Sequence, residues 1–84
     1  MREKLLKLDG LLEESIDEII EVLNKLECQE IVDAKILPSK IGTTIEINEA
    51  NDKTFFIGLG EYGYVEIVRG NSIDGSIIYM PLDD

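Results

Sequence analysis

The sequence contains no histidine and no tryptophan, and it has one cysteine and two prolines among its 84 residues. Without histidine there is no imidazole base, no serine–histidine–aspartate triad and no histidine–cysteine zinc site. The lone Cys28 excludes an internal disulfide, and with no base to activate it we interpret it as a small buried hydrophobe. The composition therefore predicts a protein that is not an enzyme and that uses no metal ion or cofactor.

Long apolar runs are also missing. The longest apolar stretches are a few residues, far short of the ~20 that a membrane-spanning helix needs. No basic segment followed by an apolar block opens the sequence, so we expect no secretory signal. These features predict a cytoplasmic protein with no membrane contact, folded as a single domain over residues 1–84.

Acidic residues are abundant. Eighteen aspartates and glutamates against eight lysines and arginines give a net charge of −10. Nucleic acids and anionic lipids are held by lysine and arginine, so this balance argues against both as partners. The charge favours either simple solubility or fast association with a basic protein, such as a toxin or a nuclease-like enzyme.

Helical spacing of apolar residues predicts a helix from Ser15 to Glu27. Ser15 followed by Glu18 fits a capping box, in which both side chains satisfy free amides at the helix start. Residues 1–12 form either a separate helix or an edge strand, because Asp9-Gly10 is a turn signal. The apolar face of the predicted helix consists of Leu12, Ile16, Ile19, Ile20, Leu23 and Leu26.

After Cys28 the pattern changes to the alternation that is typical of β-strands. Turns are expected at residues 49–52 and 70–75, and a last strand within 76–82. One amphipathic helix packed on an antiparallel meander of four to five strands makes a two-layer α+β domain. The residues expected to face the helix are Val32, Ala34, Ile36, Ile45, Ile47, Phe55, Ile57, Leu59, Val65 and Ile67.

Gly58, Gly60 and Gly63 have the spacing of the G-x-G-x-x-G fingerprint for dinucleotide phosphates. That fingerprint needs a strand that passes into a helix, whereas residues 64–68 alternate like a strand. Glu61 would also place a carboxylate against the phosphates. We therefore predict a tight hairpin turn here, with glycine supplying positive φ.

Two surfaces are candidates for partner binding. The first is an acidic ridge on the polar side of the helix. Like charges four residues apart lower the stability of a helix, and a role in binding would explain why they are there. The ridge is either a solvated face or a surface that meets a basic groove. Its residues are Glu14, Asp17, Glu18 and Glu21.

The second candidate surface combines tyrosines with carboxylates on the sheet and its hairpin. If Val65 and Ile67 face the core, the residues that alternate with them share the opposite face. Such a mixture is typical of a binding hot spot, although tyrosines also pack across strands. We favour this surface over the ridge, because aromatic anchors contribute more binding energy than rim charges. Its residues are Tyr62, Tyr64 and Glu66, with Glu61 and Glu46.

The order of these segments resembles a known family. A helix 15–26 that opens Ser-Ile-Asp-Glu-Ile-Ile is followed by strands, then by Thr-Phe-Phe-Ile-Gly-Leu-Gly at residues 54–60 and Tyr64-Val65. This order is similar to that of the Imm1-type immunity proteins of bacterial polymorphic toxin systems, over about residues 15–68. The resemblance implies an α+β cytoplasmic protein that binds and neutralises a toxin, often a nuclease or deaminase, and it carries over no catalytic residue.

The expected function is therefore that of a small acidic inhibitory binding protein, with toxin immunity first. One alternative is a phage or mobile-element inhibitor of a nucleic-acid-handling defence enzyme, in which acidity mimics phosphate. Another is a structural subunit that completes an assembly through an exposed strand edge.

Overall fold

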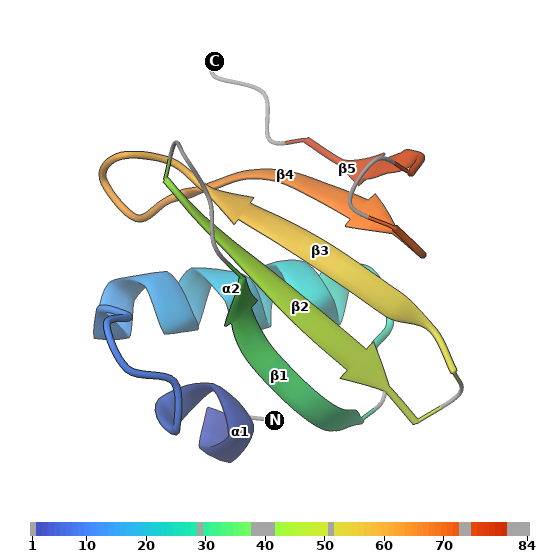
Figure 1. Cartoon of the computed structure of the whole chain (residues 1–84), viewed down its shortest axis with the longest axis horizontal. Coiled ribbons are helices and arrows are strands. Elements are labelled where there is room, and N and C mark those ends of the chain that lie inside the picture. The colour runs from blue at the N-terminus through green and yellow to red at the C-terminus, as the bar shows by residue number, and fades with distance from the viewer. Residues whose placement is uncertain (1, 29, 38–41, 51, 73–74, 81–84) are drawn as a thin grey trace.

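Two helices come first in a computed structural model of the protein, which describes residues 2–28, 30–37, 42–50, 52–72 and 75–80 (Figure 1). Helix α1 spans Arg2–Leu6 and helix α2 spans Glu13–Lys25. The predicted break between them is confirmed at Gly10, whose φ of +92° is a left-handed conformation that favours glycine. The first segment is therefore a separate helix and not an edge strand. No helix of the described chain is long and apolar enough to cross a membrane.

Both ends of α2 lie two residues before their predicted positions. The N-cap residue is Leu12, which is exposed and makes no side-chain capping hydrogen bond. The prediction of a capping box at Ser15 and Glu18 was therefore wrong. At the other end Glu27 adopts φ +59°, and the Cys28 amide donates to the Leu23 carbonyl at 2.9 Å. This geometry is that of a Schellman motif, which satisfies the last helix carbonyls and stops the helix.

The remaining elements form one antiparallel sheet. Its strands are β1 (Ile31–Leu37), β2 (Thr43–Glu49), β3 (Thr54–Leu59), β4 (Val65–Gly70) and β5 (Ile77–Tyr79). They lie in the order of the chain, so each strand is hydrogen-bonded to the next (Figure 1). The predicted α+β meander is confirmed with five strands, and the predicted end of the first strand at Pro38 lies outside the described residues. Residues 81–82 of the predicted last strand lie outside the described part of the chain.

Irregularities in the sheet moved two residues from their predicted faces. In β1 the register shifts between Ile31 and Asp33, which brings Ile31 into the core and leaves Val32 55% exposed. Between β3 and β4, Gly58 pairs with Ile67 but the next pair is Leu59 with Val65, so β4 carries one extra residue there. A bulge of this kind reverses the alternation beyond it. Val65 and Val68 are consequently buried, and Ile67 lies on the face opposite the core, against the prediction.

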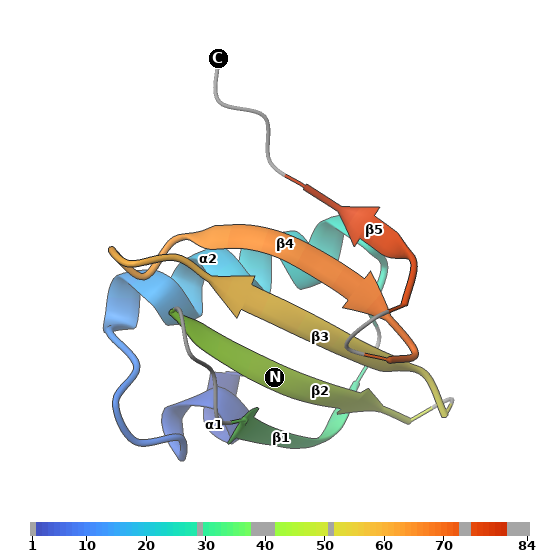
Figure 2. The same ribbon diagram turned by 45° about the horizontal axis from the view of Figure 1, so that its top comes forward.

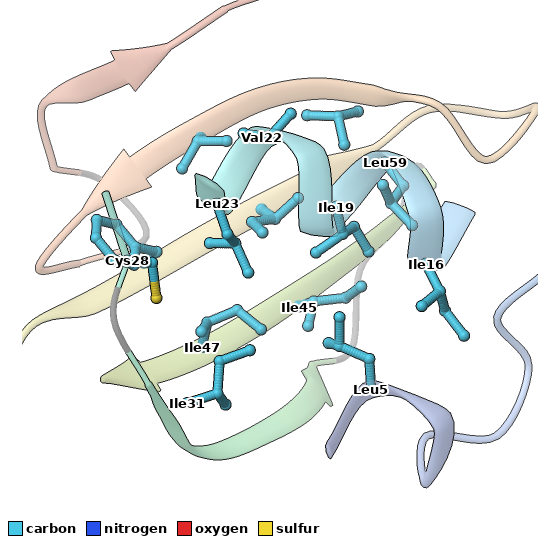
Figure 3. Packing of buried hydrophobic residues seen from close by; sticks show 14 residues of the cluster. Leu5, Ile16, Ile19, Val22, Leu23, Cys28, Ile31, Ile45, Ile47 and Leu59 are labelled. Atoms are coloured by element: carbon cyan, nitrogen blue, oxygen red, sulfur yellow. The ribbon is translucent and has the colours of Figure 1, made fainter. Parts of the chain in front are cut away.

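The core lies between α2 and one face of the sheet. Ile16, Ile19 and Leu23 project from α2 towards Ile45 and Ile47 of β2 (Figure 3). The predicted inner residues of β2 and β3 are confirmed as buried, and Ala34 and Ile36 share their face but are more exposed. Buried hydrophobic residues of the cluster are Leu5, Ile16, Ile19, Val22, Leu23, Cys28, Ile31, Ile45, Ile47, Phe55, Ile57, Leu59, Val65 and Val68.

The two helices lie on the same side of the sheet and cover different strands. In the view of Figure 2, α2 runs behind β3 and β4, whereas α1 lies beside β1 at the opposite side from β5. Leu5 of α1 is fully buried and lies next to Ile45 (Figure 3). Helix α1 therefore closes the β1 side of the core, and no helix of the described ranges covers the other face of the sheet.

This role of α1 makes a testable prediction. Replacing Leu5 by alanine should lower the free energy of unfolding by about 2–5 kcal/mol, because a fully buried leucine leaves a cavity when truncated. Leu6→Ala is the matched control, since Leu6 is 53% exposed and should cost less than about 0.5 kcal/mol. Chemical denaturation monitored by circular dichroism measures both. Equal effects of the two substitutions would show that α1 does not close the core.

Candidate functional site

The turn between β3 and β4 is the hairpin that the sequence predicts. The Gly63 amide donates to the Gly60 carbonyl at 3.0 Å, and the Gly60 amide donates to the Tyr64 carbonyl at 2.9 Å. Gly63 has φ +84°, and a Cβ there would lie 2.6 Å from the Ser15 hydroxyl oxygen. Glycine is thus required both by the turn and by its close approach to α2. The chain continues into β4, so the strand-to-helix geometry of a dinucleotide site is not formed.

Helix α2 holds this hairpin on both sides of Tyr64. The Ser15 hydroxyl donates to the Gly63 carbonyl at 2.7 Å, and the Val65 amide donates to the Glu18 carboxylate at 3.2 Å. These are the two residues predicted to cap the helix start. Instead, each reaches across 47 or 48 positions of sequence to the residue before or after Tyr64. The Tyr64 backbone is fixed to α2, while its side chain remains 63% exposed.

Tyr64 projects beside an open groove of about 560 Å³ between α2 and the β4–β5 side of the sheet. All four residues of the predicted acidic ridge line this groove. The ridge and Tyr64, treated as separate surfaces by the sequence analysis, are therefore parts of one surface, which we call the acidic groove. Its lining residues are Glu14, Asp17, Glu18, Glu21, Val22, Lys25, Tyr64 and Tyr79.

A second hollow, of about 370 Å³, shares Tyr64 with the acidic groove. It contains the remaining hairpin residues of the predicted surface together with Met80. Glu66 lies close over Gly60, where a Cβ would come within 2.7 Å of the Glu66 carboxyl carbon. Tyr64 lines both hollows. The lining residues of the second hollow are Gly60, Glu61, Tyr62, Tyr64, Val65, Glu66 and Met80.

The acidic groove contains one cation of its own. The Lys25 ammonium lies 3.7 Å from the Glu21 carboxylate and 5.9 Å from the centre of the Tyr79 ring. Both contacts are weak at this exposure. They nevertheless show that the groove accommodates a cation between a carboxylate and an aromatic ring. With four carboxylates and one ammonium along its walls, the groove carries more negative than positive charge.

Glu46 does not join this surface. It lies on β2, with β3 between it and the hairpin strand β4. Its carboxylate accepts a hydrogen bond from the Asn48 amide at 3.0 Å and pairs with the Lys35 ammonium at 3.3 Å. Glu46 therefore belongs to a local polar network on the open face of the sheet and not to the groove.

Cys28 carries no sign of reactivity. It is a buried member of the core cluster, as the sequence predicts. Burial raises the pKa of its thiol, and the Glu49 carboxylate raises it further. A raised pKa lowers the fraction of thiolate, the nucleophilic form, at neutral pH. Among the described residues, no group of three or more histidine, cysteine, aspartate or glutamate side chains lies where it could hold a metal ion.

Comparison of the chain with models of protein families, with curated protein sequences and with solved structures finds no match.

Sequence reasoning missed Tyr79 as a part of this surface. Tyr79 pairs with Val68 across β4 and β5, and it faces the core side because of a register shift next to that pair. Lys25 stands one helical turn after Glu21, so the helix periodicity already placed it beside the ridge. That β5 lies near this turn of α2 follows from the tertiary fold and cannot be predicted from a local sequence pattern.

The hydrogen bonds around Tyr64 can be tested without a partner. Replacing Glu18 by alanine should speed hydrogen exchange of the Val65 amide about tenfold, because the amide loses its acceptor. Glu18→Gln keeps an oxygen acceptor and should leave the exchange rate nearly unchanged. Glu21→Ala is the control for loss of a helix carboxylate that bonds elsewhere. Unchanged Val65 exchange in Glu18→Ala would contradict the role assigned to Glu18.

Proposed function

We propose that this protein is a small inhibitory binding protein of the immunity type, which neutralises a toxin or nuclease-like enzyme by docking the acidic groove on basic side chains. One observation carries the proposal. Tyr64, an exposed aromatic residue, is held on both sides by hydrogen bonds from α2 and lines two hollows, both of which also contain carboxylates.

Tyr64 has the properties of a binding anchor. Tyrosine is enriched among the few residues that contribute most of the energy of an interface. Its position next to two backbone atoms fixed to α2 restricts the hairpin before any partner binds. Preorganisation of this kind lowers the entropy lost on association, so more of the contact energy remains as affinity.

The charges around Tyr64 define the partner. The net charge of −10 attracts a positively charged surface and raises the rate of encounter. Enzymes that act on nucleic acids have clefts rich in lysine and arginine, because phosphate must be neutralised there. Carboxylates placed in such a cleft would occupy the phosphate positions and block the substrate. The resemblance to immunity proteins supports the same conclusion from an independent direction.

The test uses any toxin or nuclease-like enzyme encoded beside this gene, expressed in a host strain with and without the protein. Growth arrest by that enzyme should be relieved by the unmodified protein, and purified components should associate at a rate that falls steeply with salt. A failure to relieve arrest would contradict the immunity role. An inhibitor of a defence enzyme would use the same surface against a partner encoded elsewhere.

Variants separate the anchor from the charges. Tyr64→Ala should raise the dissociation rate more than about tenfold, which is a loss of ~1.4 kcal/mol in binding free energy. Tyr62→Ala should have a smaller effect, because the described hydrogen bonds from α2 go to the residues on either side of Tyr64.

The double variant Glu14→Gln with Glu21→Gln should lower the association rate and its salt dependence. Its charge-matched control is Glu3→Gln with Glu30→Gln, outside the groove. A flat salt dependence, or full activity of Tyr64→Ala, would overturn the proposal.

A further inference from the structure

Strand β5 leaves one edge of the sheet open beside the acidic groove. It is the last strand in the sheet order, and no described residue pairs with its outer edge. Exposed sheet edges are usually protected by charged residues or proline, because their free amides and carbonyls accept another strand. Residues 77–80 are Ile-Ile-Tyr-Met, without a charge, and Ile77 and Met80 are 52% and 54% exposed.

The two faces of β5 meet different surroundings. Tyr79 pairs with Val68, whose side chain is in the core, so Tyr79 faces α2 and lines the acidic groove. Ile77 pairs with Arg69, which belongs to the open face of the sheet that carries no helix. Successive side chains of an added strand would point alternately to these two faces. One set would meet the carboxylates of α2, and the other would meet Ile77.

We propose that β5 is a docking edge, at which an extended segment of the basic partner adds as a sixth strand. This inference rests on the proposed function and specifies how the partner is recognised. The segment alternates cationic side chains, which enter the acidic groove towards the carboxylates of α2, with apolar side chains, which cover Ile77. Backbone hydrogen bonds to β5 supply affinity, and the alternation supplies specificity, as in other cases of strand addition.

Charge complementarity selects the occupant. Four carboxylates and one ammonium line the groove next to the β5 edge, so cationic side chains are attracted to that face. A second copy of this chain would bring the same carboxylates towards each other and add another net charge of −10. The edge therefore fits a basic segment better than it fits another copy of itself.

The first experiment uses three capped peptides as probes. One alternates arginine and valine, one has the same composition with the arginines grouped at one end, and one alternates glutamate and valine. The alternating arginine peptide should bind at least about tenfold more tightly than the grouped peptide, and the glutamate peptide should not bind. Equal binding of the two arginine peptides, or no binding of either, would overturn strand addition.

N-methylation tests the backbone bonds directly. In a strand, the amides of successive residues point to opposite edges, so only every second amide can donate to β5. Methylating that set should reduce binding about tenfold or more, and methylating the other set should leave it nearly unchanged. Equal effects of the two sets would show that the peptide does not bind as a strand, whichever way it runs.

Variants of the protein locate the edge. Ile77→Lys places a charge beside the free edge and should reduce the affinity for the alternating peptide to that for the grouped one. Thr44→Lys is the matched control, with the same charge change on β2, three strands away in the sheet order. Both variants are first checked for unchanged circular dichroism. Equal weakening by the two, or a dimer of the unmodified protein that Ile77→Lys dissociates, would contradict the proposal.

The outcomes also separate this inference from the proposed function. If both arginine peptides bind equally and Tyr64→Ala weakens both, the groove recognises cations without strand addition, and the proposed function stands. If the alternating peptide binds as a strand but the enzyme encoded beside this gene is not inhibited, the docking edge stands and the immunity role fails.

Discussion

The width of one helix relative to the sheet is the constraint on which the structure depends. An α-helix with its side chains is about 10–12 Å across, whereas strands lie ~4.8 Å apart, so one helix covers two to three strands. Helix α2 has to cover a sheet of five strands. The uncovered side at β1 is closed by Leu5 of α1. At β5 no comparable element is present among the described residues, and the acidic groove occupies that side.

The same constraint explains the position of the charged residues. Because α2 lies over β3 and β4, its polar side borders β5 and the hairpin instead of facing only solvent (Figure 2). Ser15 and Glu18 are then close enough to bond the hairpin on either side of Tyr64. The like charges of the ridge cost some helix stability, and they line a groove that a cation can enter. Local destabilisation at a site of this kind is typical of a functional surface.

The sequence predicts the elements of this fold well, since hydrophobic periodicity over α2 and the strands follows directly from which side chains are buried. It fails where one inserted residue reverses the alternation, as at Val32 and Ile67, because a bulge depends on the pairing of two strands. The predicted capping box failed for a similar reason. Ser15 and Glu18 have the spacing of a local motif, but their hydrogen bonds go to residues almost 50 positions away.

The candidate site was predicted in part. Each of the acidic and tyrosine clusters was recognisable from residue type, but their union into one surface follows from the hairpin folding back onto α2. Glu46 shows the opposite case, since a residue of the expected type lies in a separate network with Lys35 and Asn48. Tyr79 was missed because its side depends on a register shift. Residue types thus indicated the chemistry of the surface, and the tertiary contacts decided its members.

The central claim is that α2 fixes an exposed tyrosine beside the open edge of the sheet before any partner binds. The most direct measurement is the backbone ¹⁵N order parameter of Tyr64 in the free protein, compared with that of Tyr62 in the same hairpin. We expect a value near 0.85 for Tyr64, as in a rigid strand, and a lower value for Tyr62. A value below about 0.6 for Tyr64 would show that the hairpin is flexible and would contradict the claim.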